Sequence, residues 1–178
     1  ASLALFSTEK PRGYVDKNLI FSEKGKDRHN GAEINVYGQV TDNVRLLGGT
    51  TFLHAKQRNT GSADTDGKYT IGVPKFQANL GAEWDVPALQ GLTLESRLTY
   101  TGSSYANAQN TLKVGDWTRM DVGARYIVML GNTPVTLRAR IDNLANKKYW
   151  ESVGGYPGQG YLVSGAPRTF SFNASFDF

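Results

Sequence analysis

The sequence predicts an all-β fold, an antiparallel up-and-down transmembrane β-barrel of which about eight strands are present. One observation is the final segment, 168–178, where apolar and polar residues alternate up to the terminal Phe178. Because side chains alternate along a strand, this pattern gives one apolar and one polar face. The segments before it alternate in the same way. Long polar connections and short turns also follow each other in turn, as in outer-membrane barrels.

The composition narrows the classes of protein and site. The 178 residues include 39% hydrophobic and 20% charged residues, with a net charge of +4 and no cysteine. The absence of cysteine excludes a disulfide framework and a thiolate site. The charges are scattered and mixed in sign apart from Lys147-Lys148, so we expect no nucleic-acid binding. Because the chain opens at Ala1 without an initiator Met or a signal peptide, we expect a piece of a longer protein.

Eight segments fit strands, and no apolar run approaches the roughly 20 residues of a transmembrane helix. The expected strands are 2–8, 31–40, 44–56, 75–85, 92–101, 117–128, 135–142 and 168–178. The expected long loops are 9–26 with the polar string 24–30, 57–71, 102–115 and 143–165, and the expected turns are 41–43, 87–91 and 129–134. The phase of segment 44–56 stays open, because Leu46-Leu47 and Phe52-Leu53 put apolar residues on both faces.

The charged side chains of these segments share one phase. They are Glu33, Lys75, Glu83, Glu95, Arg97, Arg119, Asp121, Arg125, Arg138, Arg140 and Asp142. An Arg or Lys that faces the middle of the lipid costs about 2–4 kcal/mol, so this phase is expected to face a lumen. An eight-stranded barrel has an interior filled by side chains. So many large charges therefore favour a wider barrel, of which this chain is one arc.

Three stretches together resemble a known family. The stretch Ile141-Asp142-Asn143-Leu144-Ala145-Asn146-Lys147-Lys148-Tyr149-Trp150 resembles the penultimate-strand element of TonB-dependent outer-membrane receptors. Gly165-Ala166-Pro167-Arg168-Thr169-Phe170, followed by alternating aromatics to Phe178, resembles their final strand. Gly31-Ala32-Glu33-Ile34-Asn35 resembles an upstream strand, although Asn35 departs from the usual second acid. The C-terminal end of the chain is most similar to the ferric-siderophore type.

The resemblance implies a fold and a function for the whole protein. It implies a plugged barrel of about 22 strands, with residues 1–178 as its C-terminal portion and with the plug domain and TonB box absent from this chain. The function implied is uptake of ferric siderophores across the outer membrane of a Gram-negative bacterium, driven through the TonB complex. The protein would then be a transporter and no enzyme, with no cofactor and with iron only in the ferric siderophore.

The resemblance also implies roles for particular residues. Charges of the lumenal phase would face the plug: Glu33, Glu95, Arg97, Arg119, Asp121, Arg125, Arg138 and Arg140. For the arginines, ion pairs within the barrel with Asp121, Asp142, Glu95 and Glu83 are favoured over contacts with plug or ligand. Aromatic residues of the last strand would signal to the barrel-assembly machinery and contact outer-membrane lipid: Phe170, Phe172, Phe176 and Phe178.

Aromatic residues at strand ends and in long loops are candidates for ligand contact. They are Tyr105, Trp117, Trp150, Tyr156 and Tyr161. The competing interpretation places them in the aromatic girdle at the lipid interface or in loop packing, and for each residue this interpretation is favoured. His29 and His54 lack any metal-ligand spacing, so no metal site is expected. No serine or threonine is arranged with a base as a nucleophile would be.

Two other protein classes remain open at this point. A self-contained eight-stranded outer-membrane barrel, acting as an adhesin or structural anchor, would close by pairing segment 2–8 with segment 167–178. A soluble binding barrel would turn its apolar phase inward, which fits poorly with a heavily charged opposite phase.

Overall fold

The computed structural model describes residues 1–15, 18–131, 133–156 and 159–176, and they form strands, turns and loops. The main sheet contains β1 (Ser2–Val15), β2 (Phe21–Thr41), β3 (Val44–Arg58), β4 (Phe76–Asp85), β5 (Leu92–Thr101), β8 (Trp117–Leu130), β9 (Thr133–Asp142) and β12 (Thr169–Phe176). Two small hairpins pair β6 (Ser104–Tyr105) with β7 (Lys113–Val114) and β10 (Trp150–Tyr156) with β11 (Gln159–Ser164). Across the described ranges, no helix has the length and apolar character needed to cross a bilayer.

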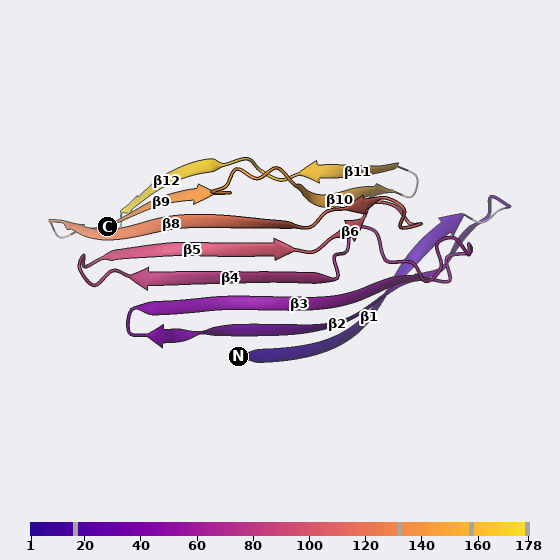
Figure 1. The fold of residues 1–178 in the computed structure, drawn as a ribbon, viewed down its shortest axis with the longest axis horizontal. Coiled ribbons are helices and arrows are strands. Elements are labelled where there is room, and N and C mark those ends of the chain that lie inside the picture. The colour runs from indigo at the N-terminus through magenta and orange to yellow at the C-terminus, as the bar shows by residue number, and fades with distance from the viewer. Residues whose placement is uncertain (16–17, 132, 157–158, 177–178) are drawn as a thin grey trace.

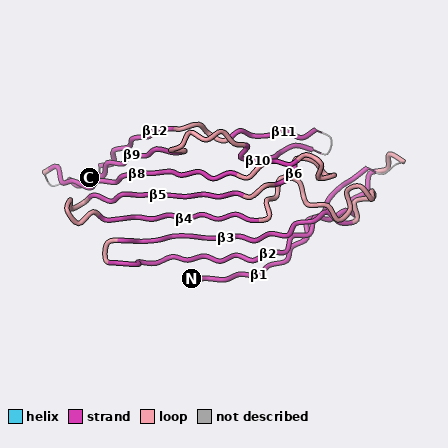
Figure 2. The backbone as a smooth tube through the Cα atoms, in the orientation of Figure 1, coloured by secondary structure: helices cyan, strands magenta, loops and turns pink. Residues whose placement is uncertain are grey.

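The main sheet is an antiparallel meander of eight strands, which confirms the predicted fold class. Its order is β1-β2-β3-β4-β5-β8-β9-β12, and every neighbouring pair is antiparallel. In Figure 1 the short turns lie at the left, together with the C-terminal end, and the longer connections lie at the right. Figure 2 shows the same division, with most of the loop backbone gathered at the right. We call these two ends of the sheet the turn end and the loop end.

The predicted long loop at 9–26 is wrong, and so is the solvated loop at 24–30. Strand β1 continues to Val15 and β2 begins at Phe21, with Glu9 opposite Arg28 and Lys10 opposite Asp27. The polar composition suggested a loop, but the opposite charges pair across the hairpin and support the strands. The predicted loops 102–115 and 143–165 likewise contain the β6–β7 and β10–β11 hairpins.

The pairing register settles the phase of β3. Leu46 lies opposite Gly38 and Ala82, which places it on the apolar face, whereas Leu47 lies opposite Tyr37 and Gly81 on the charged face. Phe52 shares the apolar face with Phe76, at a ring-centroid distance of 4.8 Å, and Phe76 lies 5.8 Å from Tyr100. These three rings form an aromatic row at the loop end of the apolar face.

The sheet has almost no apolar core of its own. Among the described residues, the only buried hydrophobic ones are Ala55, Val114, Trp117 and Val135. Large side chains of the apolar face are instead open, with Leu5 at 78% and Phe172 at 71% exposure. An exposed apolar surface of this extent needs a partner, and lipid supplies one for a sheet of this pattern.

The sheet is open within the described residues. Strand β1 pairs only with β2 and β12 pairs only with β9, so the pairing of β1 with β12 that a closed eight-stranded barrel requires is not present. The structure therefore does not support the self-contained eight-stranded barrel.

We expect the isolated polypeptide 1–178, refolded in detergent, to form no closed monomeric barrel, because the edges of β1 and β12 leave backbone hydrogen-bonding groups unmatched. Heat-modifiable migration on unboiled gels measures this directly. A compact monomer that unfolds only on boiling would contradict the open sheet.

Candidate functional site

A tight turn anchored by Asn143 connects β9 to the loop that follows it. Asn143 adopts a left-handed conformation with φ of 52° and is 1% exposed. Its side-chain amide donates to the carbonyls of Lys147 and Ala166 at 2.9 Å each, and its side-chain oxygen accepts from the Lys147 N–H at 2.9 Å. Asparagine tolerates this backbone conformation and supplies both donors and an acceptor. The Asp-Asn-Leu-Ala-Asn motif thus holds the start and the end of a long loop together.

Asp121 links this turn to the charged face. The carboxylate is 2% exposed, and its Oδ1 accepts the backbone N–H of Asn143 at 2.9 Å. Its Oδ2 lies 3.1 Å from Arg119 and 3.6 Å from Arg140. Arg140 also donates to Asp142 at 2.7 Å. A buried carboxylate needs such partners, because an uncompensated buried charge costs about 3–5 kcal/mol.

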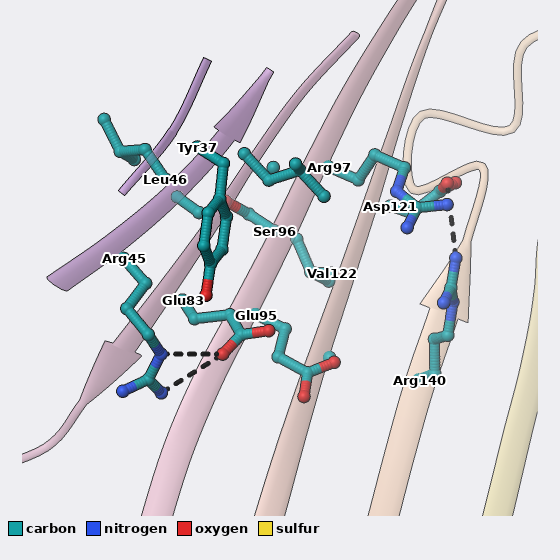
Figure 3. A pocket seen from close by; sticks show the side chains of 14 residues that line it. Tyr37, Arg45, Leu46, Glu83, Glu95, Ser96, Arg97, Asp121, Val122 and Arg140 are labelled. Atoms are coloured by element: carbon teal, nitrogen blue, oxygen red, sulfur yellow. Dashed lines mark hydrogen bonds and ion pairs between the residues drawn. The ribbon is translucent and has the colours of Figure 1, made fainter. Parts of the chain in front are cut away.

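A second group of ion pairs lies nearer the turn end. Arg45 donates to both carboxylate oxygens of Asp85, at 2.7 and 3.0 Å, and to Glu83 at 3.1 Å. Asp85 also accepts the Thr93 hydroxyl at 2.7 Å. Figure 3 shows Arg45 reaching Glu83 beside Tyr37, and the Asp121–Arg140 pair farther along the face. Arg45 did not figure among the sequence candidates, since the phase of its strand was open.

The remaining charges of this face have no opposite charge within ion-pair distance among the described residues. They are Glu33, Glu95, Arg97, Arg125 and Arg138. Glu95 lies directly opposite Glu83, and Arg125 lies directly opposite Arg138. Like charges placed opposite each other destabilise a sheet. The ion pairs predicted for Arg119 and Arg140 are present. The positive charges of Arg125 and Arg138, in contrast, are not compensated by an ion pair within the sheet.

Two glycines make a hollow in the charged face. Gly81 and Gly123 have no side chain there, and a cavity of about 220 Å³ opens above them between Glu83, Glu95 and Arg97. An added Cβ at Gly123 would lie 3.5 Å from the Glu95 carboxylate. The hollow is lined by both signs of charge, so it suits a polar protein surface better than an apolar ligand.

A larger cavity of about 1010 Å³ lies at the loop end. Its lining comes from the tops of β1 and β2, from loops 59–75 and 102–116, and from the β10–β11 hairpin. It includes Arg12, Tyr14, Ile71, Ala106, Val153 and Tyr161. Arg12 lies 3.3 Å from Asp27, a residue of the charged face, so the cavity opens on the same side of the sheet as the charges. Its size reaches the upper end of the range of about 300–1,000 Å³ typical of small-molecule sites.

Two side-chain amides, a buried one of Gln57 and a half-buried one of Asn110, tie together the two loops that line this cavity. Gln57 has no exposed surface, and its Nε2 donates to the carbonyls of Tyr69 and Ala108 at 2.9 Å each. Asn110 accepts the Tyr69 N–H at 2.6 Å and donates to the Tyr69 carbonyl at 2.9 Å. Neither amide stood out in the sequence, because a Gln at a strand end and an Asn in a polar loop are common. These hydrogen bonds give the outer loops a fixed arrangement.

The five candidate aromatics lie in different places. Tyr161 lines the loop-end cavity. Trp117 is buried against Tyr149 at a centroid distance of 4.4 Å, and Tyr105 stacks on Tyr69 at 6.1 Å. Trp150 is 49% exposed at the start of β10, and the side chain of Tyr156 lies outside the described residues.

The aromatics of β12 lie on the apolar face. Phe170, Phe172 and Phe176 are opposite Ile141, Ala139 and Val135 of β9 and are exposed. Phe178 lies outside the described residues. His29 and His54 belong to no group that could hold a metal ion, since no cluster of three or more His, Cys, Asp or Glu of that kind occurs in the described part of the chain.

Replacing Asn143 by Asp tests the turn. The substitution removes both side-chain donors and buries a negative charge beside Asp121, so we expect the barrel to lose about 3–5 kcal/mol of stability, visible as a lower unfolding temperature on unboiled gels.

Asn146→Asp is the matched control. Asn146 also has a positive φ, of 50°, but its side chain is exposed and only accepts the Arg168 N–H at 3.0 Å, which Asp can do equally well. Equal unfolding temperatures for the two variants would refute the anchoring role of Asn143.

Comparison with known proteins gives the family. The family model described as TonB dependent receptor-like, beta-barrel, matches residues 3–144. The chain is 38% identical to the ferrichrome receptor FcuA of Yersinia enterocolitica over 99% of its length and 23% of that protein. It is 33% identical, over 71% of its length and 17% of the relative, to a ferrichrome outer membrane transporter and phage receptor of Escherichia coli.

A solved structure agrees with these sequence matches. The crystal structure of BauA, the ferric preacinetobactin receptor of Acinetobacter baumannii, superimposes with a TM-score of 0.87 at 40% identity, covering 99% of this chain and 27% of that one. The chain thus spans about a quarter of the length of these relatives. The match confirms the predicted barrel architecture and the predicted family: the chain belongs to the TonB-dependent receptors and contributes strands to their β-barrel in the outer membrane of a Gram-negative bacterium.

Proposed function

We propose that the chain is part of a receptor that takes up ferric siderophores from outside the cell in a TonB-dependent manner. The observation that carries this proposal is the loop-end cavity of about 1010 Å³, which opens on the charged side of the sheet and is built from four separate segments. A cavity at the mouth of a barrel is where a ligand would bind before it enters the lumen.

The relatives support the substrate class. Those at 30% identity or more are described as a ferrichrome receptor, a ferrichrome transporter and a probable siderophore receptor, and the similar solved structure is a ferric preacinetobactin receptor. Because the chain spans about a quarter of their length, uptake is proposed for the whole protein. This chain would contribute barrel strands and some of the outer loops.

In this proposal the protein changes no covalent bond of its substrate. The relatives are transport receptors, and the arrangement of polar groups described above suits binding and orientation rather than nucleophilic or acid–base chemistry. Iron enters only as part of the ferric siderophore, and no resident cofactor is proposed.

The charged face is proposed to hold a plug domain and to change its contacts when the TonB complex acts. Among the described residues, Glu95, Arg97, Arg125 and Arg138 have no opposite charge within ion-pair distance, and Arg125 lies directly opposite Arg138, which is repulsive. Carboxylates of a plug would relieve this repulsion. Further proposed partners are outer-membrane lipid, on the apolar face, and the barrel-assembly machinery, through the aromatic end of β12.

Filling the loop-end cavity tests the binding site. In the protein expressed from its complete reading frame, Val153→Trp places an indole in the cavity, so we expect affinity for ferrichrome or ferric preacinetobactin to fall at least tenfold. Tryptophan fluorescence or radiolabelled binding to whole cells measures this. Val40→Trp, the same substitution at an exposed position at the turn end of β2, should leave affinity unchanged. The proposal would be contradicted if Val153→Trp bound both ligands as tightly as the unmodified protein does. It would also be contradicted if the unmodified protein bound neither ligand.

Reversing one lumenal charge tests the plug contact. Arg138→Glu creates an attractive pair with Arg125, so the sheet should be as stable as before, while a plug carboxylate would lose its partner. We expect cells carrying the complete protein with Arg138→Glu to become more permeable to large antibiotics such as vancomycin. Lys148→Glu, in an exposed loop, is the control. A stable Arg138→Glu barrel without any leak would argue against a plug contact at this position.

A further inference from the structure

The hairpin of β1 and β2 brings an irregular stretch of strand to the loop-end cavity. Three successive residues, Arg12, Gly13 and Tyr14, line this cavity, although the side chains of a regular strand alternate between two faces. The pairing register of β1 with β2 shifts between Arg12 and Tyr14, as at a β-bulge. A β-bulge redirects side chains locally and is common beside functional sites. The cavity therefore receives both a cation and an aromatic ring from β1.

Arg12 is the only charged residue among the described residues that line the cavity. Hydroxyl and amide groups come from side chains such as Thr65 and Gln109, and apolar surface comes from side chains such as Ile71 and Leu112. No carboxylate belongs to the described lining. These walls can exchange hydrogen bonds with a ligand and can cover its apolar surface, but any charge they present depends on Arg12.

Asp27 of β2 neutralises this cation. The Arg12 guanidinium donates to Asp27 Oδ1 at 3.3 Å, and the two side chains are only 16% and 15% exposed. Asp27 is not part of the cavity lining, so it acts on the cavity through Arg12. Lys10 lies directly opposite Asp27, but it is exposed, outside the lining and without a carboxylate within ion-pair distance among the described residues. The described walls of the cavity therefore carry no net charge.

A cavity without net charge discriminates between ferric chelates by their charge. Three hydroxamate groups, each with a single negative charge, neutralise Fe³⁺, whereas three doubly charged catecholates leave an excess of negative charge. A strongly anionic chelate would lose its hydration on entering and would gain no cation in return, which is unfavourable. An uncharged chelate loses less hydration, and its carbonyl and amide groups match the neutral donors and acceptors of the walls.

We propose that the loop-end cavity selects uncharged ferric chelates of the trihydroxamate class, and that Asp27 sets this selectivity by neutralising Arg12. The inference rests on the proposed function, because it names the substrate class of the same cavity. It gives a role to the part of the β1–β2 hairpin that extends beyond the membrane. Asp27 acts as a positioning residue, since it reaches the ligand only through the charge of Arg12.

Binding of chelates that differ in charge tests the selectivity. The protein expressed from its complete reading frame is purified in detergent. Its affinities for ferrichrome, ferric coprogen and ferric enterobactin, each labelled with radioactive iron, are measured at low salt. The first two chelates are uncharged trihydroxamates, and the third is an anionic tricatecholate. We expect both trihydroxamates to bind about a hundredfold more tightly than ferric enterobactin.

Removing the Asp27 carboxylate should shift this preference. Asp27→Asn leaves Arg12 without its partner, so we expect the preference for trihydroxamates to fall about tenfold, the order that Coulomb's law gives for one charge facing three across about 8 Å of water. Arg12→Gln/Asp27→Asn, which removes both charges, should restore the original preference. Glu9→Gln is the matched control. It removes a carboxylate of the same hairpin that lies 2.9 Å from Lys26 on the opposite face, so the preference should stay unchanged.

Gln109→Lys covers the case in which Asp27→Asn fails to fold, because an uncompensated buried charge destabilises a protein. The substitution adds a cation to the lining at an exposed position, and it should shift the preference in the same direction. Gln90→Lys, the same substitution in the exposed turn between β4 and β5, should leave the preference unchanged.

The selectivity would be overturned if the unmodified protein bound ferric enterobactin as tightly as the trihydroxamates, or if a folded Asp27→Asn variant kept the original preference. If that variant does not fold, an unchanged preference of Gln109→Lys overturns it. Binding of ferric enterobactin or ferric preacinetobactin alone would overturn the selectivity and leave siderophore uptake standing. Binding of none of these chelates would contradict the proposed function itself.

Discussion

The continuous antiparallel hydrogen-bond ladder, and the register it imposes, is the constraint on which the other features depend. Side chains alternate with a period of two, so a slip of one residue between β5 and β8 would turn Arg97 and Asp121 toward lipid. In a soluble domain a packed core helps to hold the register. In this sheet few of the described apolar side chains are buried. One face of the sheet contacts lipid and the other faces the lumen. The register is therefore enforced by the difference between lumen and lipid.

The strand pattern could be predicted from alternation alone for the segments that cross the membrane, because each face there has a single environment. Prediction failed at Glu9 to Asn30, since beyond the membrane both faces of the hairpin are polar and polarity no longer separates strand from loop. The phase of β3 needed its partners, because Leu47 lies opposite Gly81 and Leu53 lies opposite Gly31, both on the charged face rather than the face toward lipid. Local sequence cannot supply that information.

The site could be predicted less completely than the fold. The common phase of the charges followed from periodicity, but their partners depend on register. Arg45 donates to Glu83 and Asp85, and Glu95 has no cation within ion-pair distance among the described residues. The cavity at the loop end is assembled from segments more than a hundred residues apart. Gln57 and Asn110, which hold its loops, are ordinary residues in sequence. Their importance comes from the complete burial of Gln57 and from the two hydrogen bonds of Asn110 to the backbone N–H and carbonyl of Tyr69.

The carboxylate of Asp121 has two structural roles. One oxygen accepts from the turn at Asn143, which holds the base of a long outer loop, while the other serves two arginines of the lumenal surface. Substitutions in the loop base and on the lumenal surface should therefore show epistasis, with energies that do not add for residues sharing a partner. Variation among receptors at Asn143, Arg119 and Arg140 is then expected to be correlated, and transplanting the outer loop alone would separate groups that function together.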